Sequence, residues 1–317
     1  MNIIQITPAE IKSKSGNRTT ANRWARLLRD LGHRVKTATE YGGQSADMMV
    51  AIHAWRSATS ISDFKHRFPN RPIILCLGGT DINHFIHTHP EITIKSMDLA
   101  DALVGLHDLI GVITPSRLQS KLHIIFQSAQ PLPRPRQPIN RRFDVCVIGN
   151  MRDVKDPMRA ALAVRSVPEK SRIHVRHFGS SYDDQTLHLA RGEMKINPRY
   201  RWFGEVGNGR VRQELSRAQA VIISSKSEGG ANVVSEAIVA QVPVIASDID
   251  GNIGLLGRRY GGYYKMGDES SLREVLLQAE NNPDFLGSLT RQIEMLAPKF
   301  TYQREMESWR KLISKLS

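Results

Sequence analysis

Two glutamates, Glu228 and Glu236, stand eight positions apart within residues 220–251, which read AVIISSKSEGGANVVSEAIVAQVPVIASDIDG. The apolar runs at both ends predict strands, the pair Gly229-Gly230 predicts a loop, and a helix is expected to follow it. Glycines let backbone amides approach a ligand, and the first amides of a helix bind phosphate. The spacing puts Glu228 in the loop and Glu236 one turn into the helix, where each carboxylate can accept sugar hydroxyls. We therefore expect a phosphate and sugar site; the alternative is two solvated glutamates.

Basic residues follow the strand predicted at residues 143–149, in the segment GNMRDVKDP, residues 149–157. A loop at the carboxyl end of a parallel strand lies at the edge where ligands bind in open α/β sheets. Arg152 and Lys155, in the loop that Gly149 begins, place two positive charges at this edge, where they can bind an anion. We interpret this loop as the second part of the anion site; the alternative is a solvated basic loop.

A short glycine-containing loop, SGNR at residues 15–18, precedes the first predicted helix. Loops at this place in a Rossmann-like unit often hold an anion at the start of the helix. The alternative is that Asn17 or Thr19 simply caps the helix. The segment is no G-x-G-x-x-G motif, so dinucleotide binding is not expected.

Other polar residues of the amino-terminal half also follow predicted strands. Thr80 and Asp81 close the run LGGTD, while His53 and Arg56 come after the preceding strand and His107 after the next. Because the carboxyl ends of parallel strands line the ligand crevice, we expect these residues near a substrate. Each histidine taken alone is more often structural than catalytic.

Apolar runs alternate with helical patterns along the chain, which is typical of βαβ units and parallel sheets. Strands are predicted at residues 2–7, 48–53, 72–77, 102–107, 122–127, 143–149, 173–179, 200–206, 220–225 and 242–247, and helices at about 19–31, after 157, after 179, from about 232 and at about 302–316. Gly32 is expected to end the first helix. We predict an α/β protein with two Rossmann-like, doubly wound domains.

A proline-rich stretch, PLPRPRQP at residues 131–138, interrupts this alternation. Four prolines in eight residues cannot continue a helix or a central strand. The prediction is an N-terminal domain at 1–133, a linker at 134–140, a C-terminal domain at 141–300 and a helix at 301–317 that packs back on the N-terminal domain.

The net charge of +13 is spread over the chain, with 16 basic against 10 acidic residues in 1–135 and 28 against 21 in 136–317. Nucleic-acid binders often gather charge in a tail or stripe, and the aromatic residues, 6% of the chain, are not interleaved with basic clusters. An even excess instead suits an anionic small substrate. We therefore expect small-molecule substrates and no nucleic acid.

No apolar run approaches the ~20 residues that cross a bilayer, and the sequence starts without a basic n-region. The expectation is a cytoplasmic protein without stable membrane insertion. Cys76 and Cys146 sit inside apolar runs, and we interpret them as buried, reduced thiols. No Cys/His spacing suggests zinc, and Asp248-Ile249-Asp250, which matches an Asp-x-Asp metal motif, is interpreted as a loop.

The segments 149–157 and 220–251 resemble the family 4 glycosyltransferases of the GT-B fold, whose signature is Glu-x7-Glu. The resemblance implies two domains that face each other across a cleft, with Glu236 at the ribose and Glu228 at the transferred sugar. It implies a nucleotide-sugar site made of Gly149, Arg152, Lys155, Glu228, Gly229, Gly230, Ala231, Asn232, Val233 and Glu236. The chain departs from the family at Ala231, where glycine is usual, and at Asn150, where the diphosphate clamp usually has arginine.

A closer resemblance, from residue 15 to about 300, is to the selenosugar synthases of selenoneine biosynthesis. It rests on SGNRTTANRWARLLRDLGHRV, HAWRS, GGTD, GNMRDVKDP, NPRYRWFGEV and SEGGANVVSEAIVAQVPV. It implies transfer of the sugar of UDP-N-acetylglucosamine or UDP-glucose to the selenium of selenophosphate, with release of UDP and phosphate. No metal or cofactor is expected, and the downstream selenoneine synthase is a candidate partner.

The residues assigned from these arguments fall into two groups. The catalytic candidates are Arg152, Lys155, Glu228, Thr80 and Asp81. The acceptor candidates, in the domain at 1–133, are Ser15, Gly16, Asn17, Arg18, His53 and Arg56.

Two other activities remain open on the same fold. An ordinary GT-B glycosyltransferase would use the same donor site with a hydroxyl of a lipid or polysaccharide as acceptor. A sugar-nucleotide epimerase or a phosphorylase would share the fold and differ in chemistry.

Overall fold

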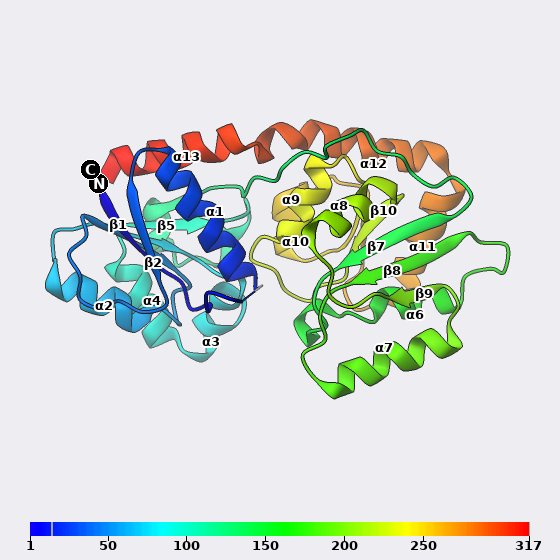
Figure 1. Ribbon diagram of the computed structural model, residues 1–317, viewed down its shortest axis with the longest axis horizontal. Helices are drawn as coiled ribbons and strands as arrows, with labels where there is room; N and C mark the ends of the chain where they lie inside the picture. Colours follow the sequence, from blue (N-terminus) through cyan, green and yellow to red (C-terminus); the bar gives the residue numbers. More distant parts are fainter. Residues whose placement is uncertain (14, 317) are drawn as a thin grey trace. The chain divides into compact units, whose positions relative to one another are not determined.

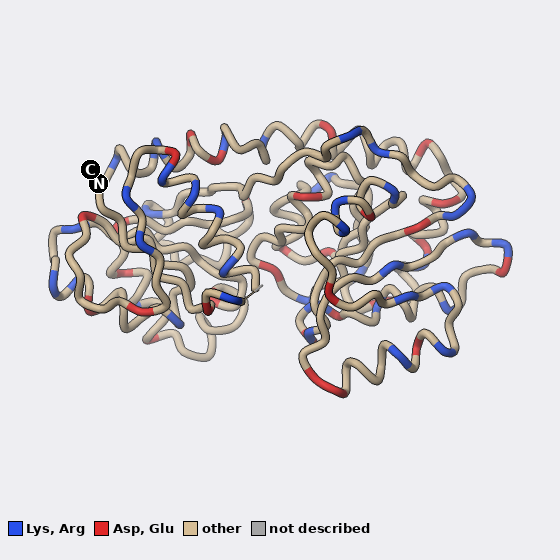
Figure 2. Tube along the Cα trace, viewed as in Figure 1, with Lys and Arg blue, Asp and Glu red and all other residues tan. Residues whose placement is uncertain are grey.

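The computed structural model describes residues 1–13 and 15–316, so Lys14 and Ser317 lie outside the described residues. The chain divides into two compact units, unit 1 (Met1–Gln127 and Tyr302–Ser317) and unit 2 (Ser128–Thr301). Each unit has one sheet of six parallel strands flanked by helices (Figure 1). The predicted α/β class with two doubly wound halves is confirmed. Figure 2 shows lysines and arginines distributed along both units.

The sheet of unit 1 has the strand order β2-β1-β3-β4-β5-β6. Its elements in chain order are β1 (Asn2–Ile6), α1 (Gly16–Asp30), β2 (Arg34–Ala38), β3 (Met48–Ile52), α2 (Ala58–Arg67), β4 (Ile73–Cys76), η1 (Asp81–Phe85), α3 (Ile86–Thr88), α4 (Pro90–Leu99), β5 (Ala102–Gly105), α5 (Ile110–Ile113), η2 (Ser116–Lys121), β6 (Leu122–Ile124) and α13 (Tyr302–Leu316). The sequence did not predict β2, because this edge strand has no fully buried residue and so no apolar run.

The two faces of this sheet bury different side chains, as strand geometry requires. Along β1, Ile4 faces the cluster that includes Phe64 of α2, while Ile3 faces the cluster that includes residues of α1 and α13. On the second face the rings of Trp24 and Trp309 lie 4.8 Å apart in an edge arrangement. The Trp24 indole also donates a hydrogen bond of 2.8 Å to Glu305. Helix α13 therefore belongs to the core of unit 1.

The sheet of unit 2 has the strand order β12-β11-β10-β7-β8-β9. Its elements in chain order are β7 (Phe143–Ile148), η3 (Asp153–Lys155), α6 (Arg159–Arg165), β8 (Ile173–Phe178), α7 (Asp184–Ile196), β9 (Tyr200–Trp202), α8 (Asn208–Arg217), β10 (Ala220–Ile223), α9 (Asn232–Val239), β11 (Val244–Ser247), α10 (Asp250–Leu256), β12 (Tyr263–Tyr264), α11 (Glu269–Asn281), α12 (Pro283–Leu296) and η4 (Ala297–Phe300). The central strands β7 and β10 are neighbours, so their following loops emerge together.

Residues 125–142, which include the proline-rich stretch, form no helix or strand. Arg136 ties this stretch to unit 2 by donating to the carbonyls of Gln241 and Ala218, at 2.6 and 2.5 Å. Burial lowers the pKa of the Arg136 guanidinium to about 10. The two cysteines are buried and free, and burial raises the pKa of both thiols.

The alternative caps at Asn17 and Thr19 are not used, because Ser15 caps α1 with its hydroxyl accepting from the Arg18 amide. Asp248 and Ile249 lie in the loop after β11, as predicted, and Asp250 is the first residue of α10. Among the described helices, none has both the length and the apolar character needed to cross a bilayer.

Candidate functional site

The loops after β7 and β10 of unit 2 bring Lys155 and Glu228 into contact. The Nζ of Lys155 lies 2.5 Å from Oε1 of Glu228, and the Ser225 hydroxyl donates to the same oxygen at 2.5 Å. The Glu228 side chain is only 9% exposed, against 31% for Lys155. A carboxylate so far removed from water needs such partners. Two residues that the sequence placed in one anion site, 73 positions apart, are thus direct neighbours.

Backbone contacts fix this pair in place. The Ser224 hydroxyl donates to the Lys155 carbonyl and the Lys226 amide donates to the Val154 carbonyl, both at 2.9 Å. The Nζ of Lys226 lies 2.7 Å from the Asp153 carboxylate on the exposed side of the same contact. The loop that carries Lys155 is therefore fastened to the loop that carries Glu228 along several residues.

A glycine that sequence reasoning missed supports the Glu228 loop from α10. A Cβ built on Gly251 would lie 2.5 Å from the Glu228 carbonyl oxygen and 2.8 Å from its Cβ. Any side chain at position 251 would displace the Glu228 backbone. The single sequence signal is a glycine in the first turn of a helix, a place that normally tolerates larger residues.

A buried histidine supports the other loop from β8. His177 Nε2 lies 3.1 Å from the Gly149 carbonyl, and Nδ1 lies 2.9 Å from the Tyr200 hydroxyl. Burial lowers the pKa of His177 to about 4, so the ring is neutral near pH 7. The carbonyl can only accept, so we assign the ring proton to Nε2. Gly179 lies so close that a Cβ there would meet the same carbonyl at 2.0 Å.

Asn150, which occupies the usual arginine position of the clamp, has a structural task. Its Oδ1 accepts from the Ser180 amide and its Nδ2 donates to the Tyr182 hydroxyl, both at 2.9 Å. Arg152, two residues later, is exposed, and no carboxylate of the described residues forms an ion pair with it. The structure thus brings Lys155, but not Arg152, into contact with Glu228.

The start of α9 follows Gly230, which has φ +125° and so a conformation that favours glycine. The N-cap position holds Ala231, whose side chain cannot accept the first amides of the helix, and the first turn has no acidic residue. The Val234 amide donates to the Ala231 carbonyl at 3.0 Å, so this member of the predicted set 231–234 is used within the turn. Glu236 lies half-buried one turn into α9, where the spacing predicted it.

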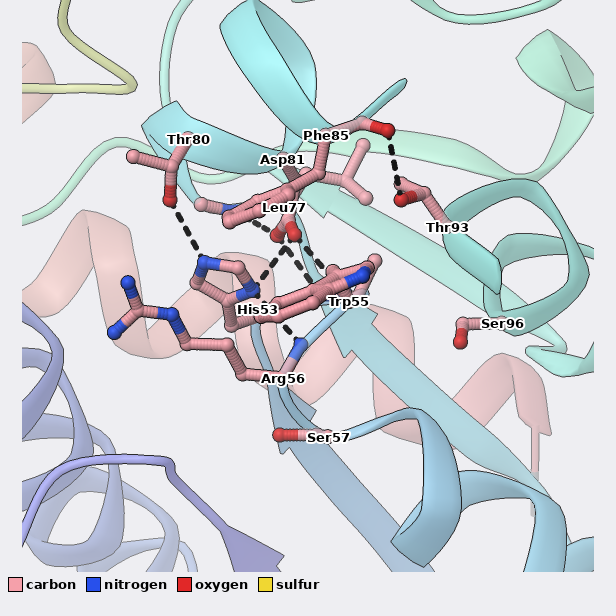
Figure 3. Close-up of polar contacts among 12 residues, drawn as sticks. His53, Trp55, Arg56, Ser57, Leu77, Thr80, Asp81, Phe85, Thr93 and Ser96 are labelled. Atoms are coloured by element: carbon pink, nitrogen blue, oxygen red, sulfur yellow. Dashed lines mark hydrogen bonds and ion pairs between the residues drawn. The ribbon is translucent and has the colours of Figure 1, made fainter. Parts of the chain in front are cut away.

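Unit 1 gathers a second cluster at the carboxyl ends of β3 and β4 (Figure 3). The centre is Asp81, whose side chain is 1% exposed. Its Oδ2 accepts from the amides of Ala54 and Gly78, both at 2.8 Å, and its Oδ1 accepts from the Trp55 amide at 3.0 Å. The buried charge is thus compensated by three backbone donors, which fix the two loops against each other.

His53 completes the set around Asp81 and connects it to Thr80. Its Nδ1 lies 2.7 Å from Asp81 Oδ1, and its Nε2 lies 2.7 Å from the Thr80 hydroxyl. We assign the proton to Nδ1, since a lone pair so close to a carboxylate would be repelled. The Arg56 amide directs its N–H at the same Nδ1 but at the longer distance of 3.2 Å, so the shorter contact with the Asp81 carboxylate decides the tautomer. His53 itself has φ +80°, a strained conformation for a residue with a side chain.

Two aromatic rings and the Arg56 side chain border this cluster. The rings of Trp55 and Phe85 stack at 4.2 Å with an angle of 4° between their planes. In Figure 3 the Arg56 side chain runs beside His53 and ends on the side where the Thr80 hydroxyl lies. Arg56 is exposed, and none of the carboxylates in the described residues pairs with it.

The loop SGNR has a different organisation from the one predicted for an anion site. Arg18 is 5% exposed, and its guanidinium donates to the carbonyls of Ala9 and Glu10. Gly16 and Asn17 form the first turn of α1 after the Ser15 cap. Arg18 therefore holds its own loop together through Nε and Nη2, and these two donors are not directed at a ligand.

Comparisons with known proteins agree with this architecture. A sequence profile of the family described as "Glycosyl transferases group 1" matches residues 131–294, just over half of the chain. A curated relative, "Glycosyltransferase 1 domain-containing protein 1" of Xenopus tropicalis, is 23% identical over 275 residues, which cover 78% of this chain and 79% of that protein.

Two solved structures share the fold. HepE of Anabaena, in complex with UDP and glucose, is 12% identical and matches 99% of this chain and 100% of its own with a TM-score of 0.79. Sucrose-phosphate synthase of Thermosynechococcus elongatus is 12% identical and matches 99% of this chain and 98% of its own with a TM-score of 0.81. The chain has the GT-B fold and belongs to the glycosyl transferases of group 1.

Proposed function

We propose that this glycosyltransferase moves the sugar of a UDP-sugar, UDP-N-acetylglucosamine or UDP-glucose, to the selenium of selenophosphate. The products are a 1-seleno-sugar, UDP and phosphate. The binding of a UDP-sugar is supported by the contact between Lys155 and Glu228 beside the start of α9. The family membership and the binding of UDP by HepE, a protein of the same fold, also support a UDP-sugar as the donor.

Each donor-site residue then has a distinct task. Lys155 gives its positive charge to the diphosphate, and the first amides of α9 bind phosphate oxygens. Glu228, released from Lys155, accepts a hydroxyl of the transferred sugar, while Glu236 accepts the ribose hydroxyls. Arg152, exposed in the same loop, adds a second cation as UDP departs. These charges do the work for which other glycosyltransferases use a metal, so we expect activity to persist in chelator.

The choice of selenophosphate rests on the sequence resemblance and on acceptor chemistry. A hydroxyl acceptor must lose a proton as it attacks, and a positioned base accelerates this step by ~100–10,000-fold. The selenium of selenophosphate is already anionic and is a soft nucleophile. Unit 1 offers its phosphate the cation of Arg56 beside the hydroxyl of Thr80. The transition state resembles an oxocarbenium ion, as in other glycosyl transfers.

The direct test incubates the full chain with each UDP-sugar and selenophosphate and follows the products by mass spectrometry. The expected result is a sugar product with the isotope pattern of selenium and an equal amount of UDP. UDP release only with a lipid or polysaccharide hydroxyl acceptor would overturn the selenium assignment and leave an ordinary glycosyltransferase. Consumption of UDP-sugar without any acceptor would point to an epimerase.

A matched pair of variants tests the donor site. Lys155→Ala should weaken UDP binding by about tenfold or more, since it removes the cation and takes from the buried Glu228 its one charged partner in this contact. Lys170→Ala, at an exposed lysine between α6 and β8 of the same unit, removes a cation away from these loops and should bind UDP as the unmodified chain does. Equal UDP affinities in the two variants, measured by calorimetry, would remove Lys155 from the diphosphate site.

A further inference from the structure

The proposed reaction has a second chemical step that the donor site does not perform. When selenium attacks the anomeric carbon, it still carries the phosphoryl group of selenophosphate. Release of phosphate then requires that water add to phosphorus and that the selenium–phosphorus bond break. Resting on the proposed function, we propose that the chain Asp81–His53–Thr80 of unit 1 activates the water that hydrolyses this bond.

The geometry is that of a base held in one tautomer. Asp81 is anchored by three backbone amides and holds the Nδ1 proton of His53 at 2.7 Å. The Nε2 lone pair of His53 is therefore directed at the Thr80 hydroxyl, 2.7 Å away. A base oriented by a carboxylate on one side and bonded to a hydroxyl on the other is the arrangement that activates nucleophiles in hydrolases. Because His53 and Asp81 are each 1% exposed, only Thr80, which is half-buried, can meet the substrate.

The backbone of His53 is strained, and the residues around its ring are closely packed. The φ of +80° at His53 is a conformation that a residue with a side chain rarely adopts and that costs free energy. A Cβ at Gly78 would lie 3.2 Å from the His53 ring and 3.3 Å from Asp81 Oδ2. A histidine that served only the core could lie in an unstrained conformation. Here the backbone bends so that the ring reaches both Asp81 and Thr80.

The neighbours suit a phosphoryl group. Arg56 ends on the Thr80 side of the ring, as Figure 3 shows, and so places a guanidinium where phosphoryl oxygens would lie. Arginine binds such oxygens with two parallel hydrogen bonds and stabilises charge on a transferring phosphoryl group. The cluster thus combines an anion-binding cation with a proton acceptor in the space around one hydroxyl.

Hydrolysis of the selenium–phosphorus bond moves one proton from water to His53 through Thr80. Thr80 accepts a hydrogen bond from water and passes its own proton to His53 Nε2, while it takes the water proton. The water oxygen bonds to phosphorus, the selenium–phosphorus bond breaks, and the electron pair leaves with selenium as a selenolate. Selenolates are weakly basic, so the leaving group needs no acid. The imidazolium that forms is stabilised by the buried Asp81 carboxylate and later returns its proton to the selenolate or to solvent.

Three variants separate this role from a merely structural one. Thr80→Val removes the hydroxyl at nearly constant volume, and Thr80→Ser restores it. His53→Asn retains a donor toward Asp81 and tolerates positive φ, but it has no group at the place of Nε2. Thr59→Val, at an exposed threonine of α2 in the same unit, is the matched control.

The assay measures UDP and phosphate from one reaction in water enriched in ¹⁸O, after subtraction of phosphate formed without UDP-sugar. The unmodified chain, Thr80→Ser and Thr59→Val should release the two products in equal amounts, with one solvent oxygen in the phosphate. In Thr80→Val and His53→Asn the phosphate-to-UDP ratio should fall at least tenfold, and a sugar that carries selenium and phosphorus should accumulate.

The outcomes distinguish the two proposals. An unmodified chain that forms no UDP with selenophosphate refutes the proposed function. Normal UDP release with an unchanged phosphate-to-UDP ratio in Thr80→Val and His53→Asn refutes only the hydrolytic role of the cluster. Parallel loss of both products in Thr80→Val, without rescue by Thr80→Ser, would assign the cluster to acceptor binding or folding and also overturns the inference.

Discussion

Substitution of Gly251 by alanine tests whether the close approach of α10 positions Glu228. The added Cβ would lie 2.5 Å from the Glu228 carbonyl oxygen, whereas ordinary contacts begin at 3.4 Å, so the Glu228 backbone must retreat by about 0.9 Å. Forcing a methyl group into such a contact costs ~1–3 kcal/mol. Alanine at a helical position normally gains up to ~1 kcal/mol over glycine. We expect a net loss of about 1 kcal/mol in the free energy of unfolding.

The effect on activity should exceed the effect on stability. A shift of about 1 Å in a positioning group can lower the rate by ~100-fold, and Glu228 is bonded to Lys155 at 2.5 Å. The assay is kcat/KM for UDP-sugar consumption, together with urea unfolding. Gly192→Ala is the control, because Gly192 lies in α7 with nothing within 4 Å of its built Cβ, and it should stabilise the chain by up to ~1 kcal/mol without change in kcat/KM. If Gly251→Ala behaved as Gly192→Ala does, the contact would not position Glu228.

Three further predictions concern groups outside that contact. The pKa of His177 is about 4 in the folded chain and ~6.5 in the unfolded chain, so the unfolded chain binds more protons between these two pH values. The free energy of unfolding should therefore be higher by about 3 kcal/mol above pH 6.5, and this stabilisation should be lost as the pH falls toward 4. Urea unfolding at pH 7.5 and 4.5 should show a smaller loss in His177→Gln than in the unmodified chain, and equal losses would contradict the assignment. Glu305→Ala should destabilise unit 1 by ~1–3 kcal/mol, because it leaves the buried Trp24 indole without its acceptor, and an unchanged unfolding midpoint would count against this reasoning. Arg18→Ala should increase proteolytic cleavage near residues 9–15, since two loop carbonyls lose their donor, whereas weaker selenophosphate binding with an intact loop would restore the anion role first predicted for Arg18.

The sequence predicted the strands that are buried on both faces, because each of them is an apolar run. Strands β3 and β4 are buried at every residue and were found within a residue or two of their ends. Strand β2 was missed because it lies at the edge with charged and half-exposed side chains, and β12 because it has two residues. The sequence therefore predicts the buried central strands of each sheet well and the exposed or very short edge strands poorly.

The two candidate sites were predictable to different degrees. The spacing of Glu228 and Glu236 and the position of Lys155 can be read from one short pattern each, since strand, loop and helix starts position them locally. The link between His53 and Asp81 spans 28 positions and depends on a positive φ that no local residue signals. Gly251 and His177 act through backbone contacts with distant loops, and composition alone gives no sign of them.

Asn150 shows how a departure from a family pattern can be required by its surroundings. The position must both accept a hydrogen bond, from the Ser180 amide, and donate one, to the Tyr182 hydroxyl. An arginine has five donors and no acceptor, so it could not satisfy the Ser180 amide. On the proposed function, a cation for the diphosphate then comes from elsewhere in the loop, and the exposed Arg152 is two residues away. Lys155 is paired with Glu228 at 2.5 Å, so on the same proposal a sugar hydroxyl that takes the place of Lys155 at that carboxylate would free the ammonium for the diphosphate and couple diphosphate binding to the sugar.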